Sequence, residues 1–562
     1  MITKILENIM KEELNKLNYN GYTKVIKSNR PDLCDYQFDG VFKLASIYKK
    51  SPIEIGEEIV SSLNERGDFS CYFKEVNFVK PGFINITISD SLINELLMKM
   101  NEKEKFNIEQ KNDEVFFLDY GGPNIAKPLH VGHLRSAIVG ESVKRIIEFK
   151  GYKTISDVHL GDYGLQIGQV IYAIKKDNIN IDDITIDYLE KAYPTISALC
   201  KENKEVKSIC EDITKELQDG NLEYHKYFLK IKEVSGNDIK RIYKYLDVNF
   251  DLWYGESDSY NYIEEAKNII DSKKLFKISE GALVVDVKED TDKKEIPPLI
   301  FRKSNGGYLY GTTDIATILQ REKEYKPDHI LYFTDLRQDM HFNQLFRTVK
   351  KASITDANLE FLGFGTVNGK DGKPYKTRSG EAPKLDNLFK EVKDLFISKK
   401  PENESMSLKD QDKIVNAIIK FADLQNNREK DYIFDIDKFS EVVGKTGPYI
   451  LYTYLRINKI IENKEITTLN NIVYNDYDRN LRIKLIELEL AFNNAFECRM
   501  PSYIADYIYD LCVIVNSFYQ NNHINSEQDL EKKNNWIYIL NLTNKIIKEM
   551  LNILVIDIPS VM

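Results

Sequence analysis

The residues best suited to do chemistry lie in one loop, residues 124–136, which carries His130 and His133 around Gly132. An apolar run at 115–118 precedes the loop and a segment with helical apolar spacing follows it, which predicts a strand, a loop and a helix start. A helix N-terminus offers free backbone N–H groups and a positive dipole end, and both favour an anion. The imidazoles add donors that stabilise a phosphate in its transition state, and the glycine lets a nucleotide approach the backbone. We therefore expect the chain to bind a nucleoside triphosphate; the less favoured alternative is a turn with two incidental histidines.

Two acidic residues lie where ligands of parallel sheets bind, near the ends of strands. Asp119 closes the predicted strand at 115–118, which places it to reach a ligand, although capping a helix is a common role for such a residue. Asp314 opens a segment with helical apolar spacing. It either caps that helix or faces a cationic ligand, and the residues alone leave both interpretations open.

A glycine-rich basic segment at 367–381 follows a predicted strand and carries four cations. Such a loop can close on a triphosphate and stabilise the departing pyrophosphate. A solvated basic surface loop is the usual explanation of a charge run. The position directly after a strand favours the phosphate-binding interpretation.

The composition bounds the class of protein. The chain has 562 residues, 42% of them hydrophobic and 30% charged, which predicts several domains with ample core. There is no run of about 18 apolar residues, so no transmembrane helix is expected, and residues 1–17 have the spacing of an amphipathic helix rather than a signal peptide. The six cysteines include no CxxC pair, which favours reduced thiols in a cytoplasmic protein and indicates no metal site. A net charge of −10 argues only weakly against a nucleic-acid partner, because binding depends on local basic surface.

Three domains are predicted along the chain. Residues 1–105 have the pattern of a small α+β domain, with strand-like residues at 71–73. Residues 106–395 alternate strands with helices, which predicts an α/β domain with a parallel sheet and a helical insertion near 180–250. Residues 396–562 have helical spacing nearly throughout. Within the second domain the predicted strands are 115–118, 153–160, 281–286, 329–333 and 361–367.

Together these motifs resemble class I aminoacyl-tRNA synthetases, whose HIGH signature matches His130-Val131-Gly132-His133. The details are similar to the arginyl-tRNA synthetase family, and the similarity spans nearly the whole chain. The stretches that carry it are 123–136, 159–166, 310–314, 335–338 with His341 and Phe342, 426–434, 446–449 and 454–456, and an N-terminal stretch at 40–63. The resemblance implies a Rossmann-like catalytic domain, an N-terminal tRNA-contacting domain and a C-terminal all-helical anticodon-binding domain.

The resemblance also implies roles for the residues of the first loop. His130 and His133 would contact the phosphates of ATP, with Gly132 and Lys127 completing the catalytic set. The class's second signature, KMSKS, is degraded here, because Thr377 stands where its catalytic lysine would be. Many arginyl enzymes share this loss and carry a lysine ahead of the histidines, and Lys127 matches that lysine. The full set of residues implied to bind ATP is Pro123, Asn124, Ile125, Ala126, Lys127, Pro128, Leu129, His130, Val131, Gly132, His133, Lys376 and Arg378.

The substrates implied by the resemblance are L-arginine, ATP with Mg²⁺ and the tRNA for arginine, which react through an arginyl-adenylate. Arginine presents a planar fork that two carboxylates can bind in bidentate fashion. The residues implied to bind it are Asp119, Asn124, Tyr310, Asp314 and Gln338, with Glu256 as a weaker candidate. Gly122 replaces a frequent serine of relatives, which removes one hydroxyl contact. A pocket that pairs a guanidinium rejects lysine and citrulline by itself, so no editing domain is expected.

The C-terminal domain is expected to read the anticodon, because aromatic stacking on splayed bases is the usual way to read single-stranded RNA. Tyr449, Tyr454 and Arg456 are the candidate tRNA-binding residues; for each tyrosine, packing in a helical core is an equally good explanation. Leu451 stands where relatives often have glutamine. By resemblance the protein is expected to be a monomer, with no membrane partner. The alternatives are another H-x-G-H nucleotidyltransferase, a non-enzymatic tRNA-binding paralogue, and a synthetase for another amino acid.

Overall fold

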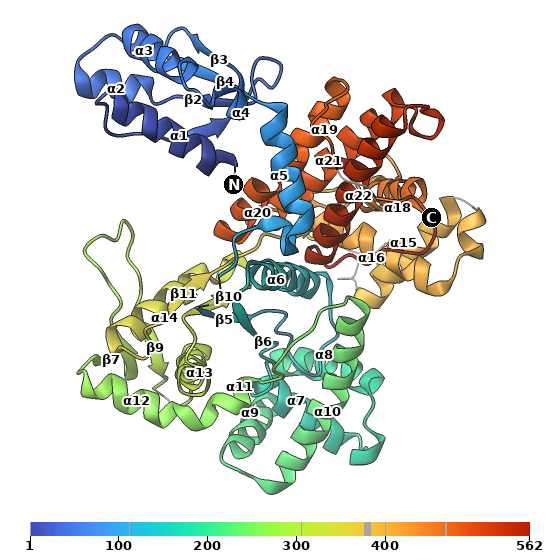
Figure 1. Ribbon diagram of the computed structural model, residues 1–562. Coiled ribbons are helices and arrows are strands. Elements are labelled where there is room, and N and C mark those ends of the chain that lie inside the picture. The colour runs from blue at the N-terminus through green and yellow to red at the C-terminus, as the bar shows by residue number, and fades with distance from the viewer. Residues whose placement is uncertain (1, 112, 305, 376–383, 400, 467–468) are drawn as a thin grey trace. The chain divides into compact units, whose positions relative to one another are not determined.

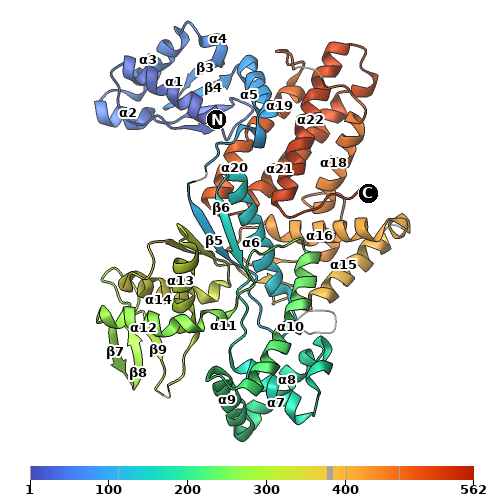
Figure 2. The same ribbon diagram turned by 60° about the horizontal axis from the view of Figure 1, so that its bottom comes forward.

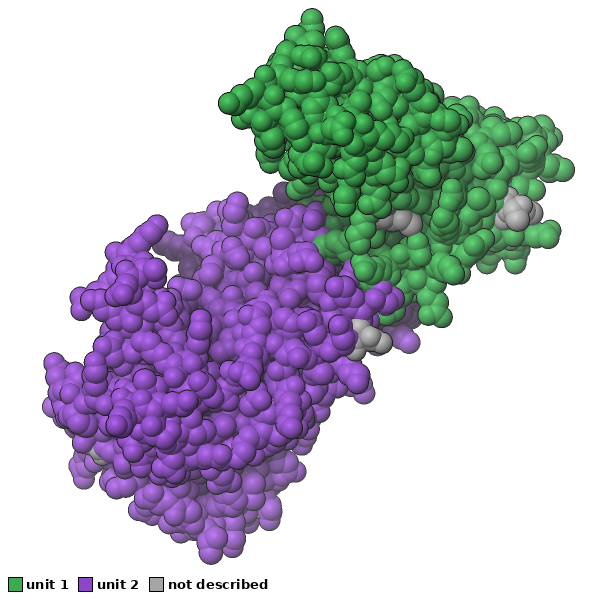
Figure 3. Space-filling model, turned by 60° about the vertical axis from the view of Figure 1, so that its left-hand side comes forward, with its two compact units in different colours: residues 1–109, 452–493, 506–549 green, residues 110–451, 494–505, 550–562 purple. Residues whose placement is uncertain are grey.

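The computed structural model describes residues 2–111, 113–304, 306–375, 384–399, 401–466 and 469–562. The chain forms two compact units, each assembled from separate stretches of the sequence (Figure 3). Unit 1 contains residues 1–109, 452–493 and 506–549. Unit 2 contains residues 110–451, 494–505 and 550–562. None of the described helices is both long and apolar enough to span a membrane.

The N-terminal part of unit 1 is an antiparallel sheet of strand order β1-β2-β4-β3 with helices packed on it (Figure 1). In β4, Ile84, Ile86 and Ile88 alternate with half-exposed residues, as expected of a sheet with one buried face. The elements are α1 (Ile2–Lys16), β1 (Val25–Lys27), β2 (Tyr36–Phe38), α2 (Val41–Tyr48), α3 (Pro52–Asn64), α4 (Phe69–Tyr72), β3 (Phe73–Val79), β4 (Phe83–Ile88), α5 (Asp90–Glu102) and η1 (Glu104–Asn107).

One prediction for this part is wrong. Residues 71–72 were predicted as strand but end the short helix α4, and β3 begins only at Phe73. The rings of Phe69 and Phe73 lie 5.4 Å apart at a spacing of four residues, a contact that a helical turn makes and a strand does not.

Helices form the rest of unit 1. They are α18 (Gly447–Ile461), α19 (Asp476–Ile486), α20 (Leu488–Glu497), α21 (Ser502–Asn521), η6 (Ile524–Ser526) and α22 (Leu530–Ile553). The first residues of α18 and α21 and the last residues of α20 and α22 belong to unit 2. Helix α19 packs against α5, and its Arg479 pairs with Asp35 and Asp90. One turn later, Arg482 is fully buried; it pairs with Asp478 and donates to Asn94. These arginines join the helices of unit 1 to its N-terminal sheet domain.

Unit 2 is built around a parallel sheet of order β11-β10-β5-β6, which confirms the predicted α/β class (Figure 1). Its strands are β5 (Val115–Asp119), β6 (Lys153–Asp157), β10 (His329–Tyr332) and β11 (Asn358–Phe361). The helices that alternate with them are α6 (Val131–Lys150), α7 (Leu165–Lys176), α13 (Tyr310–Tyr325) and α14 (Asp339–Ala352). A buried apolar cluster that includes Phe117, Ile318, Ile330 and Leu345 joins strands β5 and β10 to α13 and α14.

The predicted insertion near 180–250 is helical, as expected. It contains η2 (Ile181–Asp183), α8 (Ile186–Glu202), α9 (Lys204–Gln218) and α10 (Leu222–Tyr245). The chain then forms α11 (Glu256–Ser259), η3 (Tyr260–Tyr262), α12 (Ile263–Ser272), β7 (Phe276–Ser279), β8 (Ala282–Val285) and β9 (Leu299–Arg302). After the sheet come η4 (Leu336–Gln338), β12 (Val367–Asn368), α15 (Leu385–Lys399), η5 (Pro401–Ser405), α16 (Leu408–Leu424), β13 (Tyr432–Ile433) and α17 (Ile436–Phe439).

Two strand predictions differ from the structure. The strand predicted at 281–286 exists as β8, but it belongs to a separate antiparallel sheet β7-β8-β9 because Glu280 and Gly281, both with positive φ, form a tight hairpin turn. The predicted strand 361–367 is divided between β11 and β12. Between them, Phe364 N donates to Thr334 O and Gly365 N donates to Arg428 O, so the chain leaves the parallel sheet and crosses to β13.

The buried pair of Arg482 and Asp478 predicts a stability defect. Arg482→Ala leaves the Asp478 carboxylate buried without its counter-ion, which should lower the free energy of unfolding by about 3–5 kcal/mol. A Trp253→Phe background leaves Trp536 of unit 1 as the only fluorescent tryptophan for a urea titration. Arg30→Ala, which breaks an exposed pair with Asp32 in the same unit, is the matched control and should change little. An unchanged midpoint for Arg482→Ala would contradict the prediction.

Candidate active site

The carboxyl edge of the parallel sheet carries a buried cluster of charges. Asp119 and Asp157 end neighbouring strands in register, and Tyr332 lies opposite Asp119 on the other side. Arg321 of α13, only 2% exposed, donates from Nη2 to Oδ2 of Asp119 at 2.6 Å and to Oδ2 of Asp157 at 3.1 Å. Burial raises the pKa of Asp119, although the charge of Arg321 opposes that shift. The prediction that Asp119 binds arginine stays a prediction, and its carboxylate already has a partner within the chain.

His159, two residues beyond β6, extends this cluster. Its Nδ1 lies 3.4 Å from Oδ2 of Asp157, and its φ of +43° is unusual for a residue with a side chain. Burial lowers the pKa of His159, but the adjacent Asp157 and the charge of Asp119 outweigh burial and raise it to about 9. The cluster of Arg321, His159, Asp119 and Asp157 is therefore close to neutral at pH 7.

Glu256 begins α11 and is held there by its neighbour in the sequence. Asp162, which is fully buried, accepts hydrogen bonds from the backbone N and the hydroxyl of Ser257 at 2.9 and 2.7 Å. Lys232 of α10 balances the Asp162 charge at 2.7 Å. Burial raises the pKa of Glu256 to about 7, and the charge of Asp314 adds to this rise while His159 opposes it. Glu256, Asp314 and His159 thus lie within electrostatic reach of one another.

Asp314 is the fifth residue of α13, which begins at Tyr310 after the N-cap residue Leu309. Asp314 therefore does not cap this helix, and of the two interpretations that the sequence leaves open, the ligand-facing one remains. Oδ2 of Asp314 is 2.6 Å from Nε2 of His341 on α14, and this pairing raises the pKa of His341 even though burial lowers it. Tyr310, one turn earlier, is 61% exposed. Although most of the residue is exposed, partial desolvation by the surrounding protein and then the charge of Glu256 raise the Tyr310 pKa, so these two side chains are neighbours as well. Gln338 accepts a hydrogen bond from the Thr334 hydroxyl at 2.7 Å.

Asn124 lies in a loop held by backbone pairing with the segment after β6. Gly161 N donates to Pro123 O at 3.0 Å, and Ile125 N donates to Gly161 O at 3.1 Å. Gln166 Nε2 then contacts Asn124 Oδ1 at 3.4 Å. A Cβ at Gly161 would collide with the Asn124 side chain, which explains the glycine. The predicted loop residues 123–127 are therefore positioned by the residues around His159.

The two histidines begin α6 as a reciprocal cap. His130 Nδ1 accepts from Gly132 N, and His133 Nδ1 accepts from His130 N, both at 3.1 Å, with the ring centres 4.0 Å apart. A Cβ at Gly132 would lie 3.0 Å from the His130 ring, so a larger residue would displace it. Burial and then Lys127 lower the pKa of His130; burial, His130 and Lys127 lower that of His133 to about 3. Both rings are neutral at pH 7 and carry their proton on Nε2, the atom that can donate to a phosphate.

The base of the basic loop is a small parallel pair of strands, β12 and β13. Gly369 N donates to Lys373 O at 2.8 Å and Tyr375 N to Val367 O at 2.9 Å, which forms a hairpin stem. Arg135 of α6, 1% exposed, pairs with Asp423 and donates to the carbonyls of Gly365 and Lys430. The start of α6 and the base of the loop are therefore joined. Lys376 and Arg378, predicted to bind ATP, lie outside the described residues.

The three candidate tRNA-binding residues lie on α18, but in different units. Tyr449 belongs to unit 2, whereas Tyr454 and Arg456 belong to unit 1. The guanidinium of Arg456 lies 4.1 Å from the ring centre of Tyr519 on α21. Burial raises the pKa of Tyr454. Arg456 therefore has a stacking partner within the chain.

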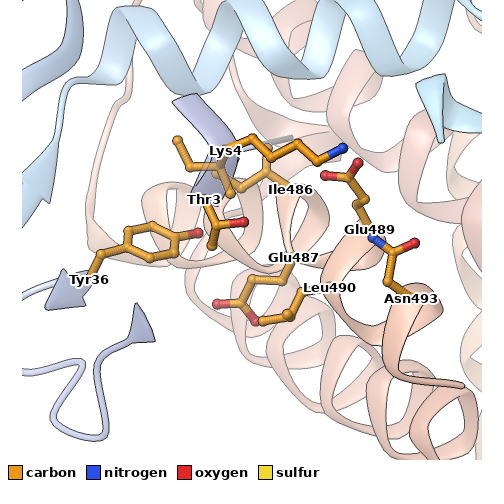
Figure 4. A pocket seen from close by; sticks show the side chains of 9 residues that line it. Thr3, Lys4, Tyr36, Ile486, Glu487, Glu489, Leu490 and Asn493 are labelled. Carbon is orange, nitrogen blue, oxygen red and sulfur yellow. The ribbon is translucent and has the colours of Figure 1, made fainter. Parts of the chain in front are cut away.

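A pocket lies away from all of these residues, within unit 1 (Figure 4). Thr3, Lys4 and Tyr36 line it from the N-terminal sheet domain, opposite Asn493 of α20 and Glu487, the residue between α19 and α20. The residues predicted to bind ATP and arginine all belong to unit 2. Among the described residues, no group of three or more His, Cys, Asp or Glu side chains could hold a metal ion.

Sequence reasoning assigned no role to several members of the charged cluster. Arg321 has a detectable signal, because it follows Asp314 by seven residues and so lies on the same face of α13, among apolar positions. A cation on the apolar face of a helix indicates a buried anionic partner. His159 and His341 lie within stretches that carried the family resemblance, but nothing in the sequence says which carboxylate each one meets.

The opposite pKa shifts of the histidines are testable by NMR. Between pH 5 and 8 we expect the His133 ring signals to stay at their neutral position and those of His159 to stay at their protonated position. Asp157→Asn removes an anion that stabilises the His159 imidazolium, so the His159 pKa should fall toward the titrated range. The ring signals are assigned to residues with the variants His133→Gln and His159→Gln. Titration of wild-type His159 near pH 6 would show that its imidazole is not held protonated and would refute the prediction.

Comparisons with known proteins agree with this geometry. The family model for the class I (R) tRNA synthetase catalytic domain matches residues 93–436. The arginyl-tRNA synthetase N-terminal domain matches residues 4–88, and the DALR anticodon-binding domain matches residues 450–562. The matched catalytic domain includes residues 426–434, which lie in the stretch 396–562 that the sequence predicts as the anticodon-binding domain.

Relatives and solved structures match over nearly the full length. An arginine–tRNA ligase of Alkaliphilus oremlandii is 41% identical, with 96% of each chain covered, and one of Agathobacter rectalis is 41% identical over 99% of this chain and all of the relative. The structure of Plasmodium falciparum arginyl-tRNA synthetase has a TM-score of 0.83 at 26% identity, covering 100% of this chain and 99% of that one. The Thermus thermophilus arginyl-tRNA synthetase shares the fold, with a TM-score of 0.82 at 19% identity and full coverage of both chains. The chain therefore belongs to the arginyl-tRNA synthetase family of class I tRNA synthetases.

Proposed function

We propose that this chain attaches L-arginine to its cognate tRNA in two steps. In the first, a carboxylate oxygen of arginine attacks the α-phosphorus of ATP, the bond to the β-phosphate breaks, and arginyl-adenylate and pyrophosphate form. In the second, a hydroxyl of the terminal tRNA ribose, the 2′-hydroxyl by family resemblance, attacks the activated carbonyl and releases AMP. Full-length relatives named arginine–tRNA ligase support this proposal.

The observation that carries the proposal is the pair of neighbouring carboxylates on α11 and α13. Glu256 has a pKa raised by burial and by the charge of Asp314, so the protein keeps negative charge there at a cost in free energy. A guanidinium would remove that cost by pairing with both acids. Tyr310 lies within electrostatic reach of Glu256 and offers an aromatic face to such a cation. We infer that Glu256 and Asp314 together bind the arginine side chain.

The remaining predicted arginine contacts fit the other end of the substrate. Asn124 and Gln338 carry amide groups suited to the α-amino end and to orienting the side chain. Oδ2 of Asp119 accepts a hydrogen bond from Arg321, so any contact between Asp119 and the substrate arginine would use Oδ1. In this proposal Asp119 mainly fixes Arg321 and the strand ends, and Glu256 takes the side-chain role first assigned to Asp119.

The phosphate side uses the loop at 123–133. The Nε2–H groups of His130 and His133 donate to oxygens of the α-phosphate as negative charge develops, and Lys127 supplies the positive charge that the degraded second signature lacks. Mg²⁺ enters with ATP, bound mainly by phosphates and water. By family resemblance, the charges of Lys376 and Arg378 stabilise the departing pyrophosphate.

The tRNA side of the proposal follows the domain organisation. Residues 1–105 contact the body of the tRNA, and the C-terminal helical domain reads the anticodon with Tyr449, Tyr454 and Arg456 among its contacts. The domain bounds at 105 and 395, a monomeric state and a cytoplasmic location stay predictions. When tRNA binds, the Arg456 guanidinium would either move away from the Tyr519 ring or stack between that ring and a base of the tRNA.

A charging assay tests the function directly. The full chain is supplied with ATP, Mg²⁺, unfractionated tRNA and one amino acid at a time, including citrulline, the neutral isostere of arginine. We expect charging with arginine, and kcat/KM lower by roughly 10⁴-fold or more for citrulline and lysine, because either would leave buried carboxylates unpaired. Charging of a different amino acid, or none with arginine, would overturn the proposal.

Glu256 predicts a pH dependence of arginine binding. Below its pKa of about 7 the carboxyl is protonated, so guanidinium binding must release a proton, and the Kd for arginine should rise about tenfold for each pH unit below 7. Glu256→Gln should weaken binding at pH 8 by roughly 10- to 100-fold and remove most of this dependence. Calorimetry in buffers of different ionisation enthalpy measures both effects. Glu264→Gln, a change on the exposed face of α12, is the control, and a wild-type Kd that does not change with pH would count against the role of Glu256.

A further inference from the structure

The helical insertion, to which the sequence assigned no chemical role, brings one of its helices to the phosphate loop. Helix α8 packs against α7, α9 and α10 (Figure 2). The buried face of α8, which includes Leu189, Ala192 and Ile196, makes this packing contact. Tyr193 lies beside that face and is half-buried. The ammonium of Lys127 lies 4.6 Å from the centre of the Tyr193 ring, a cation–π distance.

A second contact of α8 lies one turn earlier. Glu190 forms an ion pair with Lys384, the first described residue after the basic loop. Lys384 also forms a β-bridge with His130, and Leu385 N donates to Leu129 O at 3.0 Å. One helix of the insertion therefore contacts both sides of the predicted ATP site: the lysine of the first loop and the residue that follows the second.

The position of Lys127 matters because its charge reaches both histidines. The Lys127 ammonium contributes to the lowered pKa of His130 and of His133, although burial contributes more in each case. A lysine side chain has four flexible torsions and a compact, strongly hydrated charge, so it needs a partner to stay in one place. The described residues give Lys127 no carboxylate partner within 4.0 Å; the partner they give it is the Tyr193 ring.

Tyr193 also reaches toward the predicted arginine site. It is among the groups that act electrostatically on Tyr310, after burial and Glu256. Tyr193 thus lies at cation–π distance from the lysine of the phosphate loop and within electrostatic reach of the tyrosine expected to face the arginine side chain.

We propose that Tyr193 is a positioning residue for adenylate formation: its ring holds the Lys127 ammonium beside His130 and His133, where that ammonium meets the phosphates of ATP. Helix α8 of the insertion is then a wall of the active site. An aromatic face suits this task because it attracts the ammonium without neutralising it, whereas a carboxylate would cancel the charge needed by the transition state. The proposal rests on the proposed function and on the role of Lys127 within it.

A double-mutant cycle tests this coupling in the full chain. The rate measured is arginine-dependent pyrophosphate exchange in the presence of tRNA, with kcat and the KM for ATP determined separately. Lys127→Met should lower kcat by roughly 100-fold or more. Tyr193→Leu, which removes the ring, should lower kcat about 3- to 10-fold, and Tyr193→Phe, which keeps the ring, should retain at least half of the wild-type rate. In the Lys127→Met background, Tyr193→Leu should have no further effect.

Controls separate positioning from folding. Tyr188→Leu makes the same change five residues earlier on α8, where the tyrosine hydroxyl donates to Asp177, and should leave the rate unchanged. A slow Lys127→Met with a normal or faster Tyr193→Leu would overturn the inference and leave the proposed function standing. Equal losses from Tyr193→Leu in both backgrounds, or a Tyr193→Phe as slow as Tyr193→Leu, would also overturn it. A normal rate for Lys127→Met would refute the role of Lys127 and the inference with it, and wild-type protein inactive with arginine would refute the proposed function itself.

Discussion

A guanidinium buried at the carboxyl edge of the parallel sheet is the interaction on which the site depends. Arg321 donates to Asp119 and Asp157, which end neighbouring strands, and its guanidinium lies 4.5 Å from the Phe117 ring. Ions taken out of water lose several kcal/mol of hydration unless they pair closely. The three charges therefore hold one another, and with them the ends of β5 and β6, in one arrangement. The loops that carry Asn124 and His159 leave the sheet from those strand ends.

The same cluster determines where negative charge remains for a substrate. Arg321 and protonated His159 balance Asp119 and Asp157 within the chain. Two further carboxylates remain: Glu256, with its raised pKa, at the start of the short helix α11, and Asp314, beside His341, on α13. In the proposed function, a substrate guanidinium pairs with these two acids, as the guanidinium of Arg321 pairs with Asp119 and Asp157. In that proposal, Asp119 and Asp157 support the site, and Glu256 and Asp314 provide its specificity for arginine.

Much of the fold was predictable, because strand and helix periodicity report burial directly. Strands β5, β6 and β10 of the parallel sheet, the helix that begins at the histidines and the helical insertion follow from local pattern, whereas only Phe361 of β11 lies in a predicted strand. One prediction failed where distant chain segments decide. Residues 361–367 have the composition of one strand but divide between the sheet and β13, because the backbone of Gly365 pairs with Arg428. A two-residue strand such as β13 has no periodicity to read, and its existence depends on a partner more than 60 residues earlier.

The sequence by itself determined the chemistry: two histidines on a helix start, a lysine ahead of them, acids at strand and helix ends, and the order of the domains. These follow from residue types and short spacings, which are local properties. Only the tertiary structure decided which charges meet. It paired Asp119 with Arg321, brought Glu256 near Asp314, and placed Tyr193 of the insertion against Lys127. The reason is physical: the free energy of a charged side chain depends on its burial and on its neighbours, and in these three pairs the neighbours come from segments that lie roughly 60 to 200 residues apart in the sequence.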